Sequence, residues 1–247
     1  MKTIKISKLI TTLLFIVSAL FMSSCEPDTP EPTVKEYGKV MLVHAAAGVS
    51  TLDLFIDGVK KNTAPIAYKS NSTYQQVEAG ALNHQIMSKY SATGAKLDSV
   101  GLRVNKDVGY SYYSYVDNDA NKTVRVFAST ENLAAPAAGK SKVRLVHLIP
   151  DVPANIAIDV EAVTPGSIPS SRNDFTNVTF KSLKDFVEIT KGTYDIKIKQ
   201  TGTTNVLLTI ENVTLTEGKI YTFVAHGFAT KLNTDPAGPT VTVVANN

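Results

Sequence analysis

One short stretch of this sequence occurs twice, and this repeat is the strongest constraint on how the chain can fold. Residues 39–44 read Lys-Val-Met-Leu-Val-His, and residues 142–147 read Lys-Val-Arg-Leu-Val-His. The two copies lie about a hundred residues apart, which is the size of one small β domain. A repeat at this spacing predicts two copies of one domain in tandem.

Further matched segments follow the first pair in the same order in both halves. Segments 74–80 and 186–192 share an aromatic residue, a β-branched residue and a closing glycine at the same spacing. The other matched pairs are 52–58 with 155–160, 102–104 with 213–215, 110–112 with 221–223, and 123–128 with 240–245. Because the order is kept, we infer duplication of a whole domain, although the copies have diverged enough that they need not share a function.

Both halves show the pattern of short β-strands. No apolar period of 3.6 residues is sustained, and Asp57-Gly58 is a strong hairpin-turn signal. The predicted strands are 39–44, 51–56, 71–77, 83–90, 96–104, 110–116 and 122–128, then 142–147, 155–160, 175–180, 186–189, 194–199, 206–210, 219–226 and 240–245. About seven short strands per half predict an all-β fold of two tandem β-sandwich domains, immunoglobulin-like or prealbumin-like.

The first residues have the pattern of an export signal. Lys2, Lys5 and Lys8 precede the apolar stretch Leu9–Met22, which is shorter than the ~20 residues of a membrane-spanning helix. Removing these three lysines cancels the formal net charge of +3, so the mature chain has no basic field for nucleic acid. The only cysteine is Cys25, which excludes a disulfide within the chain.

The residues around this cysteine resemble a known processing site. Met22-Ser23-Ser24-Cys25 resembles the relaxed lipobox of bacterial lipoproteins, in which the cysteine thiol receives a diacylglycerol and the preceding peptide is removed. Several acyl chains at ~0.8 kcal/mol per buried methylene form a durable membrane anchor. We therefore predict lipidation at Cys25; an ordinary cysteine near a signal cleavage site is the alternative.

The residues after Cys25 indicate where in the cell envelope the protein is located. Glu26–Pro32 is acidic and Pro-rich, which predicts an extended tether. Acidic residues at this place resemble the surface-export signal of Bacteroidetes lipoproteins, although prolines interrupt them and the usual serine is missing. The predicted location is the outer membrane with exposure at the cell surface, and a periplasm-facing lipoprotein is the alternative.

These patterns give the predicted organisation of the chain. The segments are a signal peptide at 1–24, a tether at 25–37, a first β-sandwich at 38–131, a linker at 132–140 and a second β-sandwich at 141–247. The Pro-, Gly- and Ser-rich stretch 164–174 is longer than its counterpart in the first half. It predicts a loop, which is either a binding loop or a tolerated insertion.

The second copy of the repeat carries a family resemblance. Val143–His147 followed by Pro150-Asp151-Val152-Pro153-Ala154 resembles the opening motif of a bacterial family, domain-of-unknown-function family 4397. The first half keeps Asp57-Gly58 of that pattern but has Ala46–Ser50 in place of Pro-Asp-x-Pro; the second half has the reverse. The resemblance implies an exported β-sandwich, commonly in tandem on a lipoprotein, with no established activity or site.

Two histidines recur with the repeat. Alternation along the strand places His44 on the same face as Val40 and Leu42, and His147 on the matching face, which predicts core positions. We expect both to be structural, with the following loop supplying hydrogen bonds to the ring; a ligand or catalytic role is the alternative. His84 and His226 are not spaced with them as metal ligands, so we predict no metal and no cofactor.

No motif predicts a catalytic residue. The sequence contains no Gly-x-Ser-x-Gly elbow and no Gly-rich phosphate loop. Asp117 and Asp119 fit a turn better than acid–base catalysis, and a calcium site is the remaining alternative. A Ser-His-Asp site stays open on composition alone.

The densest aromatic run is a candidate binding surface. Tyr113 and Tyr115 share one face of a strand, and Tyr110 and Tyr112 share the other, so one pair must be exposed or lie at a domain contact. Exposed tyrosines stack on sugars or anchor protein interfaces. Cross-strand packing in the core is the alternative.

The sequence therefore favours a non-enzymatic, lipid-anchored envelope protein that serves as a binding, adhesion or assembly module for a glycan or protein partner. One alternative is an envelope- or polymer-degrading hydrolase, which a deep pocket with convergent polar side chains would favour. The other is a structural subunit or spacer of a surface assembly, which an unpaired edge strand would favour.

Overall fold

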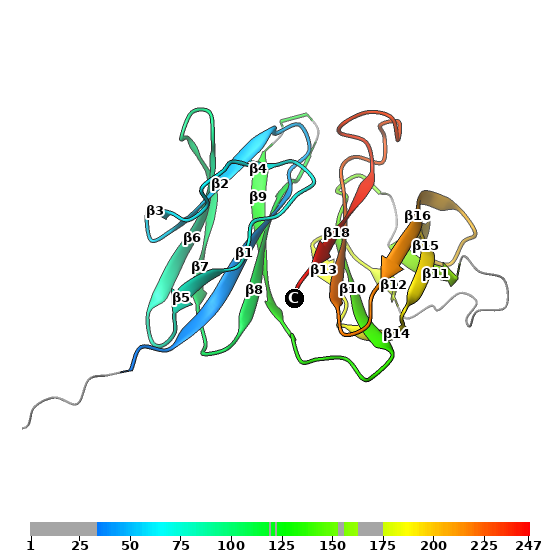
Figure 1. Cartoon of the computed structure of the whole chain (residues 1–247). Coiled ribbons are helices and arrows are strands. Elements are labelled where there is room, and N and C mark those ends of the chain that lie inside the picture. Colours follow the sequence, from blue (N-terminus) through cyan, green and yellow to red (C-terminus); the bar gives the residue numbers. More distant parts are fainter. Residues whose placement is uncertain (1–33, 119, 122, 153–155, 163–174) are drawn as a thin grey trace, which may run out of the picture. The chain divides into compact units, whose positions relative to one another are not determined.

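The computed structural model describes residues 34–118, 120, 121, 123–152, 156–162 and 175–247 (Figure 1). All regular secondary structure in these residues is β-strand, and none of them forms a helix that could cross a membrane. Lys35–Asn247 gather into one compact unit. The predicted leader, Cys25, the tether up to residue 33, and the predicted loop 164–174 lie outside the described residues.

The first half is a sandwich of two sheets (Figure 1). The inner sheet has the order β5 (Gln75–Glu78), β1 (Tyr37–Ala45), β8 (Gly109–Val116), β9 (Val124–Glu131). The outer sheet has the order β3 (Val59–Lys60), β2 (Thr51–Ile56), β6 (Asn83–Tyr90), β7 (Lys96–Arg103), with β4 (Ile66–Ala67) also paired to β2.

The second half repeats this arrangement. Its inner sheet has the order β13 (Ser182–Leu183), β10 (Lys140–Leu148), β17 (Ile220–His226), β18 (Thr240–Ala245), with β14 (Val187–Thr190) also on β10. Its outer sheet has the order β12 (Phe175–Val178), β11 (Ile156–Ala162), β15 (Gly192–Gln200), β16 (Val206–Leu215). The strands β1 and β10 run parallel to β8 and β17, whereas the other neighbours are antiparallel. The shared strand order confirms the predicted pair of tandem sandwiches.

Both faces of the repeated strand are buried. Val40 and Leu42 lie in the core between the two sheets of the first half, as their alternation predicts. Met41 and Val43 face the other way, into a third apolar cluster that also contains Val146 of the second half. Strands that are buried on both faces have nearly continuous apolar sequences, which explains why the repeat shows little polar alternation.

The third cluster joins the inner sheets of the two halves. Its buried members are Met41, Val43, Ala45, Tyr113 and Tyr115 from the first half and Val146, Leu148, Val224 and Val244 from the second. Burial of apolar surface stabilises by ~25 cal/mol per Å², so a shared apolar cluster of this kind holds the halves together. We call this contact the inter-half interface.

Most strands lie where the sequence predicts them, and the exceptions have physical reasons. The strand predicted at 71–77 is regular only over Gln75–Glu78, because Asn71 and Ser72 meet β1 through one isolated bridge and the Ser72 side chain, which accepts a hydrogen bond from the Leu42 N–H. The short strands β3, β4 and β13 were not predicted. The hairpin turn at Asp57 and Gly58 is confirmed, with φ of 50° and 79°, the positive values that a two-residue hairpin turn needs.

Candidate functional site

The four candidate tyrosines are buried, which corrects the prediction of an exposed tyrosine surface. Tyr110 and Tyr112 lie in the core of the first half, with 5% and 1% exposure. Tyr113 and Tyr115 lie in the inter-half interface, with 0% and 3% exposure. The reason is the position of β8, a central strand covered by the outer sheet on one face and by the second half on the other. Of the arrangements open from sequence, packing and a domain contact are the ones observed.

The Tyr110 hydroxyl makes a structural hydrogen bond that Tyr221 repeats in the second half. The Tyr110 hydroxyl accepts a hydrogen bond from the Asn105 backbone N–H at 3.1 Å, and the Tyr221 hydroxyl accepts the same bond from Thr216 at 3.1 Å. This bond from a tyrosine early in a strand to the backbone before it resembles the tyrosine corner of immunoglobulin-like sandwiches. The repeated tyrosine therefore fixes the turn that leads into β8 and β17.

The repeated histidines are structural, as predicted. The Nδ1 atoms of His44 and His147 each accept a hydrogen bond at 3.3 Å from the backbone N–H two residues later, on Ala46 and Ile149. Burial lowers the pKa of each ring to about 4, so both are neutral at pH 7. The repeat conserves a buried hydrogen-bond acceptor that shapes the loop after the strand.

An aromatic-Lys-Ser triplet accompanies each histidine, and the sequence analysis missed it. In Tyr68-Lys69-Ser70 and Phe180-Lys181-Ser182 the lysine N–H donates to the histidine carbonyl, at 3.0 and 2.9 Å. The rings of Tyr68 and Phe180 pack edgewise on His44 and His147, with centroids 5.7 and 6.2 Å apart. The signal was available, because the triplets have the same separation as the matched segments 74–80 and 186–192.

The same two aromatic residues reach across the inter-half interface. The Tyr68 hydroxyl lies 3.1 Å from Nδ1 of His226, and the Phe180 ring packs 5.8 Å from the Tyr115 ring. Alignment of Tyr110 with Tyr221 makes Tyr115 and His226 equivalent positions. The two contacts are therefore copies of each other, which is the signature of a two-fold, isologous interface.

An ion pair is sealed inside this interface. Arg144, 2% exposed, pairs with Glu131 of the first half and donates to Thr222 Oγ1 at 3.0 Å and to the Tyr113 hydroxyl at 2.8 Å. The other Glu131 oxygen accepts from Asn246 Nδ2 at 3.2 Å. With its partners satisfied and no solvent access, this network suits a structural role and offers nothing to a ligand.

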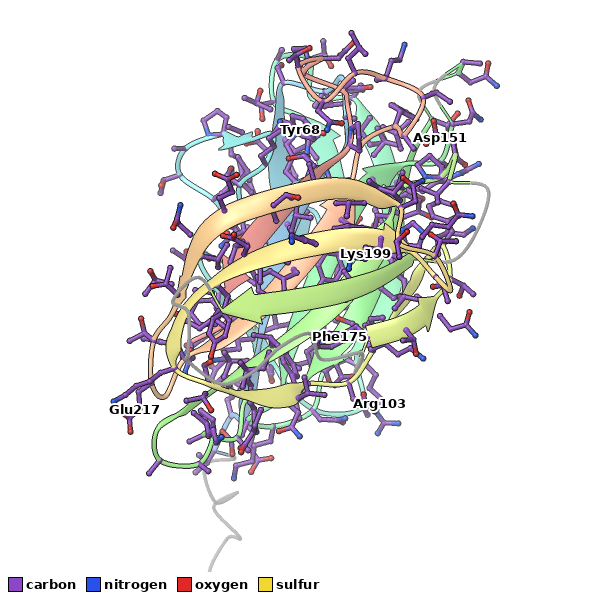
Figure 2. All side chains as sticks on the ribbon, turned by 90° about the vertical axis from the view of Figure 1, so that its right-hand side faces the viewer. Tyr68, Arg103, Asp151, Phe175, Lys199 and Glu217 are labelled. Carbon is purple, nitrogen blue, oxygen red and sulfur yellow. The ribbon has the colours of Figure 1, made fainter. Side chains whose placement is uncertain are left out.

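The aspartate of the Pro-Asp-x-Pro motif also has a structural role. Asp151 accepts hydrogen bonds from the Ala229 N–H at 2.7 Å, the Thr230 N–H at 3.0 Å and the Thr230 hydroxyl at 2.6 Å. Partial burial alone would raise the pKa of Asp151, but these hydrogen bonds outweigh it and hold the pKa below its usual range. Asp151 (labelled in Figure 2) thus anchors the connection 227–239, which inserts Phe228 into the core of the first half.

The remaining candidate catalytic or metal-binding side chains that the structure describes make structural contacts. His84 lies 2.6 Å from Asp57 through Nδ1 and 2.8 Å from the Glu78 carbonyl through Nε2, so neither ring nitrogen is free to act as a base. Asp117 pairs with Arg125 at 3.2 Å, and Asp119 lies outside the described residues. In the part of the chain that is described, no three His, Cys, Asp or Glu side chains come together as a metal site.

Two adjoining cavities on the surface are the best candidate for a binding site. One, of about 420 Å³, is lined by residues 61–66, 70–73 and 75; the other, of about 410 Å³, is lined by residues 39, 41, 71–74 and 245–247. They share Asn71, Ser72 and Thr73, and we call them together the Asn71 groove. Both volumes fall in the ~300–1,000 Å³ range of small-ligand sites. Sequence reasoning missed the groove because it is formed by irregular segments.

One wall of the Asn71 groove is fixed by an amide–carboxylate pair. The Asn62 side chain accepts from the Leu54 N–H at 2.7 Å and donates to Asp53 Oδ1 at 2.7 Å. Lys60 pairs with the other Asp53 oxygen at 2.8 Å. Burial alone would raise the pKa of Asp53, but the bonds from Lys60 and Asn62 hold it below its usual range. Residues 61–65 are therefore held against β2 mainly by side-chain bonds, together with the Lys61 N–H, which donates to the Leu54 carbonyl at 2.9 Å.

The facing wall is fixed to β1. Ser72 Oγ accepts from the Leu42 N–H at 2.9 Å and donates to the Thr73 carbonyl at 2.8 Å. Asn71 Nδ2 donates to the Ser72 carbonyl at 2.9 Å, and Lys39 Nζ lies 4.6 Å above the Tyr74 ring. These bonds preorganise the groove, so a ligand need not order it on binding.

The sequence matches the family described as Domain of unknown function (DUF4397) over residues 38–161 and 155–247. Among curated proteins, no match was found. One similar solved structure is the CBM26 module of Eubacterium rectale Amy13K in complex with maltoheptaose, at 11% identity and a TM-score of 0.27, covering 84% of this chain and 96% of that one. Another is a Bacteroides eggerthii protein described as a candidate cell adhesion protein, at 14% identity and a TM-score of 0.26, covering 87% and 96%. TM-scores this low carry no information about function.

Proposed function

The chain belongs to the DUF4397 family of domains of unknown function, and from its own geometry we propose that it is a non-enzymatic binding module of the bacterial cell envelope. The observation that carries this proposal is the Asn71 groove. Its walls are held by hydrogen bonds of Asn62 and Ser72, while Thr63, Asn71 and Thr73 are exposed. Preorganised polar groups beside a surface groove suit recognition of an external glycan or protein.

The alternative of a hydrolase finds less support in the described residues. Hydrolysis needs a base that is free to take a proton. His44, His147 and His226 are buried, and both ring nitrogens of His84 face oxygen acceptors. The Asp53 carboxylate, which contacts Asn62 in the groove wall, is held by Lys60 and Asn62. This arrangement favours binding over catalysis.

We place this module on a lipid anchor at Cys25, in the outer membrane and exposed at the cell surface. The pattern of residues 22–25 and the acidic tether support this part of the proposal. Protease shaving of intact host cells tests it, because exposed sandwiches are then lost without permeabilisation. Protection until the membrane is permeabilised would move the protein to the periplasmic side. Incorporation of a labelled fatty acid that Cys25→Ser abolishes would establish the anchor.

The binding function can be tested on the chain without its first 25 residues, which retains the compact unit Lys35–Asn247. We expect saturable binding to a member of a panel of microbial and dietary glycans and isolated envelope proteins. Thr73→Arg would fill the groove and abolish this binding, whereas Thr209→Arg, on the exposed part of β16, would not. Turnover of a glycan by the chain, or binding indifferent to Thr73→Arg, would contradict the proposal.

One observation favours a second candidate function, a subunit of a surface assembly. Figure 2 shows β16 at the border of its sheet, and no other described strand pairs with its outer edge. In the first half the corresponding edge is closed, since Asp98 of β7 accepts from the Val126 N–H of β9 at 3.2 Å. A free ten-residue edge can accept a strand from another chain. Chemical cross-linking on cells between a cysteine at Thr209 and a neighbour would support this role, and its absence would exclude it.

A further inference from the structure

The charged side chains that line the Asn71 groove have one sign. Among the lining residues, Lys61 and Lys39 are cationic, and no Asp or Glu side chain contributes to either cavity. In the described part of the chain, neither lysine lies within ion-pairing distance of a carboxylate, although Lys35, Lys60, Lys106 and Lys191 all do. The groove therefore carries two cations that form no close ion pair in the described residues, although Asp57 interacts with Lys61 at longer range and Asp107 lines a neighbouring cavity with Lys39.

Both lysines are partly buried, and each can present its ammonium group to a ligand. Lys39 and Lys61 are each of intermediate exposure. A lysine buries its methylene stem and keeps its ammonium group at the surface, where the ammonium is available to an anion. The Lys39 Nζ lies 4.6 Å from the Tyr74 ring, which leaves its hydrogen-bond donors open to a ligand. An anionic group supplied by a ligand would complete both sites.

The other lining groups fit a sugar chain better than a peptide. Most of the uncharged exposed or partly exposed members are amides and hydroxyls, and the others are Ala64, Pro65, Tyr74 and Ala245. The amides and hydroxyls are Asn62, Thr63, Ser70, Asn71, Thr73, Gln75 and Asn247. Such groups donate and accept hydrogen bonds in the pattern that sugar hydroxyls require. Peptide interfaces depend instead on deep apolar or aromatic anchor pockets. In this groove the large apolar side chains of Ile66 and Met41 are buried, and the exposed apolar residues are the small Ala64, Pro65 and Ala245.

We propose that the Asn71 groove binds an anionic glycan, with Lys61 and Lys39 contacting its carboxylate or sulfate groups and the amide and hydroxyl side chains contacting its sugar hydroxyls. This inference rests on the proposed binding function and names its ligand class. The two cavities adjoin at Asn71–Thr73, so a linear chain of several sugars would run along both. Carboxylate and sulfate share this chemistry, and the test separates them.

The test is a calorimetric titration of the chain without its first 25 residues. The probes are polygalacturonate for carboxylates, chondroitin sulfate for both groups, and dextran as the neutral polymer. We expect saturable binding of at least one anionic polymer, weakened by added salt, and no binding of dextran. Binding of polygalacturonate alone would assign a uronic acid ligand, and binding of chondroitin sulfate alone would assign sulfate as the required group.

Charge-matched variants localise the site. Lys61→Gln and Lys39→Gln should each weaken binding about tenfold, the usual effect of losing one hydrogen bond to a charged group. Lys96→Gln removes the same charge from an exposed position on β7 and should leave binding unchanged. Equal weakening by Lys96→Gln would overturn the proposal, because binding would then reflect net charge. Circular dichroism of each variant confirms that it is folded.

Different results would contradict the anionic-glycan ligand and the proposed binding function. If only a neutral glycan or an envelope protein binds, and Thr73→Arg abolishes that binding, the anionic-glycan inference is overturned and the binding module stands. If no glycan and no envelope protein binds the wild-type chain, both are overturned. Loss of anionic-polymer binding in both groove lysine variants, with Lys96→Gln unaffected, supports both.

Discussion

The strands β1 and β10 are copies of one strand, and the third residue of their shared motif gives the two halves different roles. In β1 this residue is Met41, which packs in the apolar inter-half cluster. In β10 it is Arg144, which pairs with Glu131 inside the same interface. The backbone arrangement is the same, so the difference comes from the side chain alone. It teaches that a duplicated domain can keep a two-fold contact and still make its two sides chemically distinct.

The physical consequence of this difference is specificity. A buried ion pair adds little net stability, but separating its members is expensive. Because Arg144 comes from one half and Glu131 from the other, any other docking of the halves would strand a buried charge. The apolar cluster favours association in general, and the ion pair selects this particular arrangement.

The largest expected effect comes from breaking this asymmetry on one side. Glu131→Gln leaves the Arg144 guanidinium buried without a carboxylate, which should lower the free energy of unfolding by about 3–5 kcal/mol. Urea denaturation measures this change. Restoring the β1-like residue as well, in Glu131→Gln with Arg144→Met, should recover most of the loss. A single variant within about 0.5 kcal/mol of wild type would show that the pair is not sealed from water.

Acid should destabilise the fold through three buried histidines. His44 and His147 are repeated in both halves, and His226 is not. The pKa values of His44 and His147 are lowered by burial to about 4, and that of His226 to about 3, from 6.5. The unfolded state therefore binds more protons between these values and 6.5, so stability is complete above pH 6.5 and falls as pH drops toward 4 and below.

The slope of this loss is about 1.4 kcal/mol per pH unit for each titrating histidine. Urea unfolding at a series of pH values between 7 and 4 measures it. His147→Asn should reduce the slope in this window, while Asp57→Asn, which removes an exposed contact of His84, should leave the contribution of the buried rings unchanged. A flat profile down to pH 4 would show that these rings are accessible to protons in the folded state.

A smaller loss of stability should come from Asp151, which anchors the connection after β17 and has no counterpart for the connection after β8. Asp151→Asn replaces a carboxylate that accepts three hydrogen bonds from Ala229 and Thr230, and should cost about 1–3 kcal/mol. Hydrogen exchange should accelerate at the amides of Ala229 and Thr230. In the first half Ala46–Ser50 replaces the Pro-Asp-x-Pro motif, so no aspartate from that segment anchors the connection after β8. Amide exchange in that connection, for example at Asp117 and Asn118, should therefore not change.

The smallest effect compares the repeated tyrosines. Tyr110→Phe and Tyr221→Phe each remove the acceptor of one backbone N–H bond, which should cost about 0.5–1.5 kcal/mol. Tyr110 is buried and Tyr221 is only partly buried, so the loss should be larger at Tyr110. Thermal unfolding of both variants tests the order. The reverse order would mean that burial does not decide the strength of this corner.

The fold was largely predictable because the repeat and the strand alternation are local signals. The two sandwiches, most strands, the turn at Asp57 and the structural histidines all followed from residue order and period. The sheet partners did not, since pairing of β1 with β8 joins segments that are far apart in the sequence. Burial of both faces of β8 could not be separated from exposure of one, which is why the tyrosines had two interpretations.

The inter-half interface and the candidate site were harder to predict than the fold. Arg144 and Glu131 are residue types that are almost always exposed, so nothing in the sequence marked them as buried partners. The Asn71 groove depends on side-chain bonds of Asn62 and Ser72 to distant backbone groups, which no periodic pattern records. The absence of catalytic motifs led to the prediction of a binding protein, but it said nothing about where binding would occur.

The most direct test of the two-fold interface is equilibrium unfolding of the chain without its first 25 residues in urea. Tyrosine fluorescence reports the tertiary packing of both halves and of Tyr113 and Tyr115 in the interface, and far-ultraviolet circular dichroism reports the strands of both halves. If the halves are joined as one unit, the two signals should follow a single coincident transition, and Glu131→Gln should move that transition to a lower urea concentration. Two separated transitions in the wild-type chain, one for each sandwich, would contradict the account.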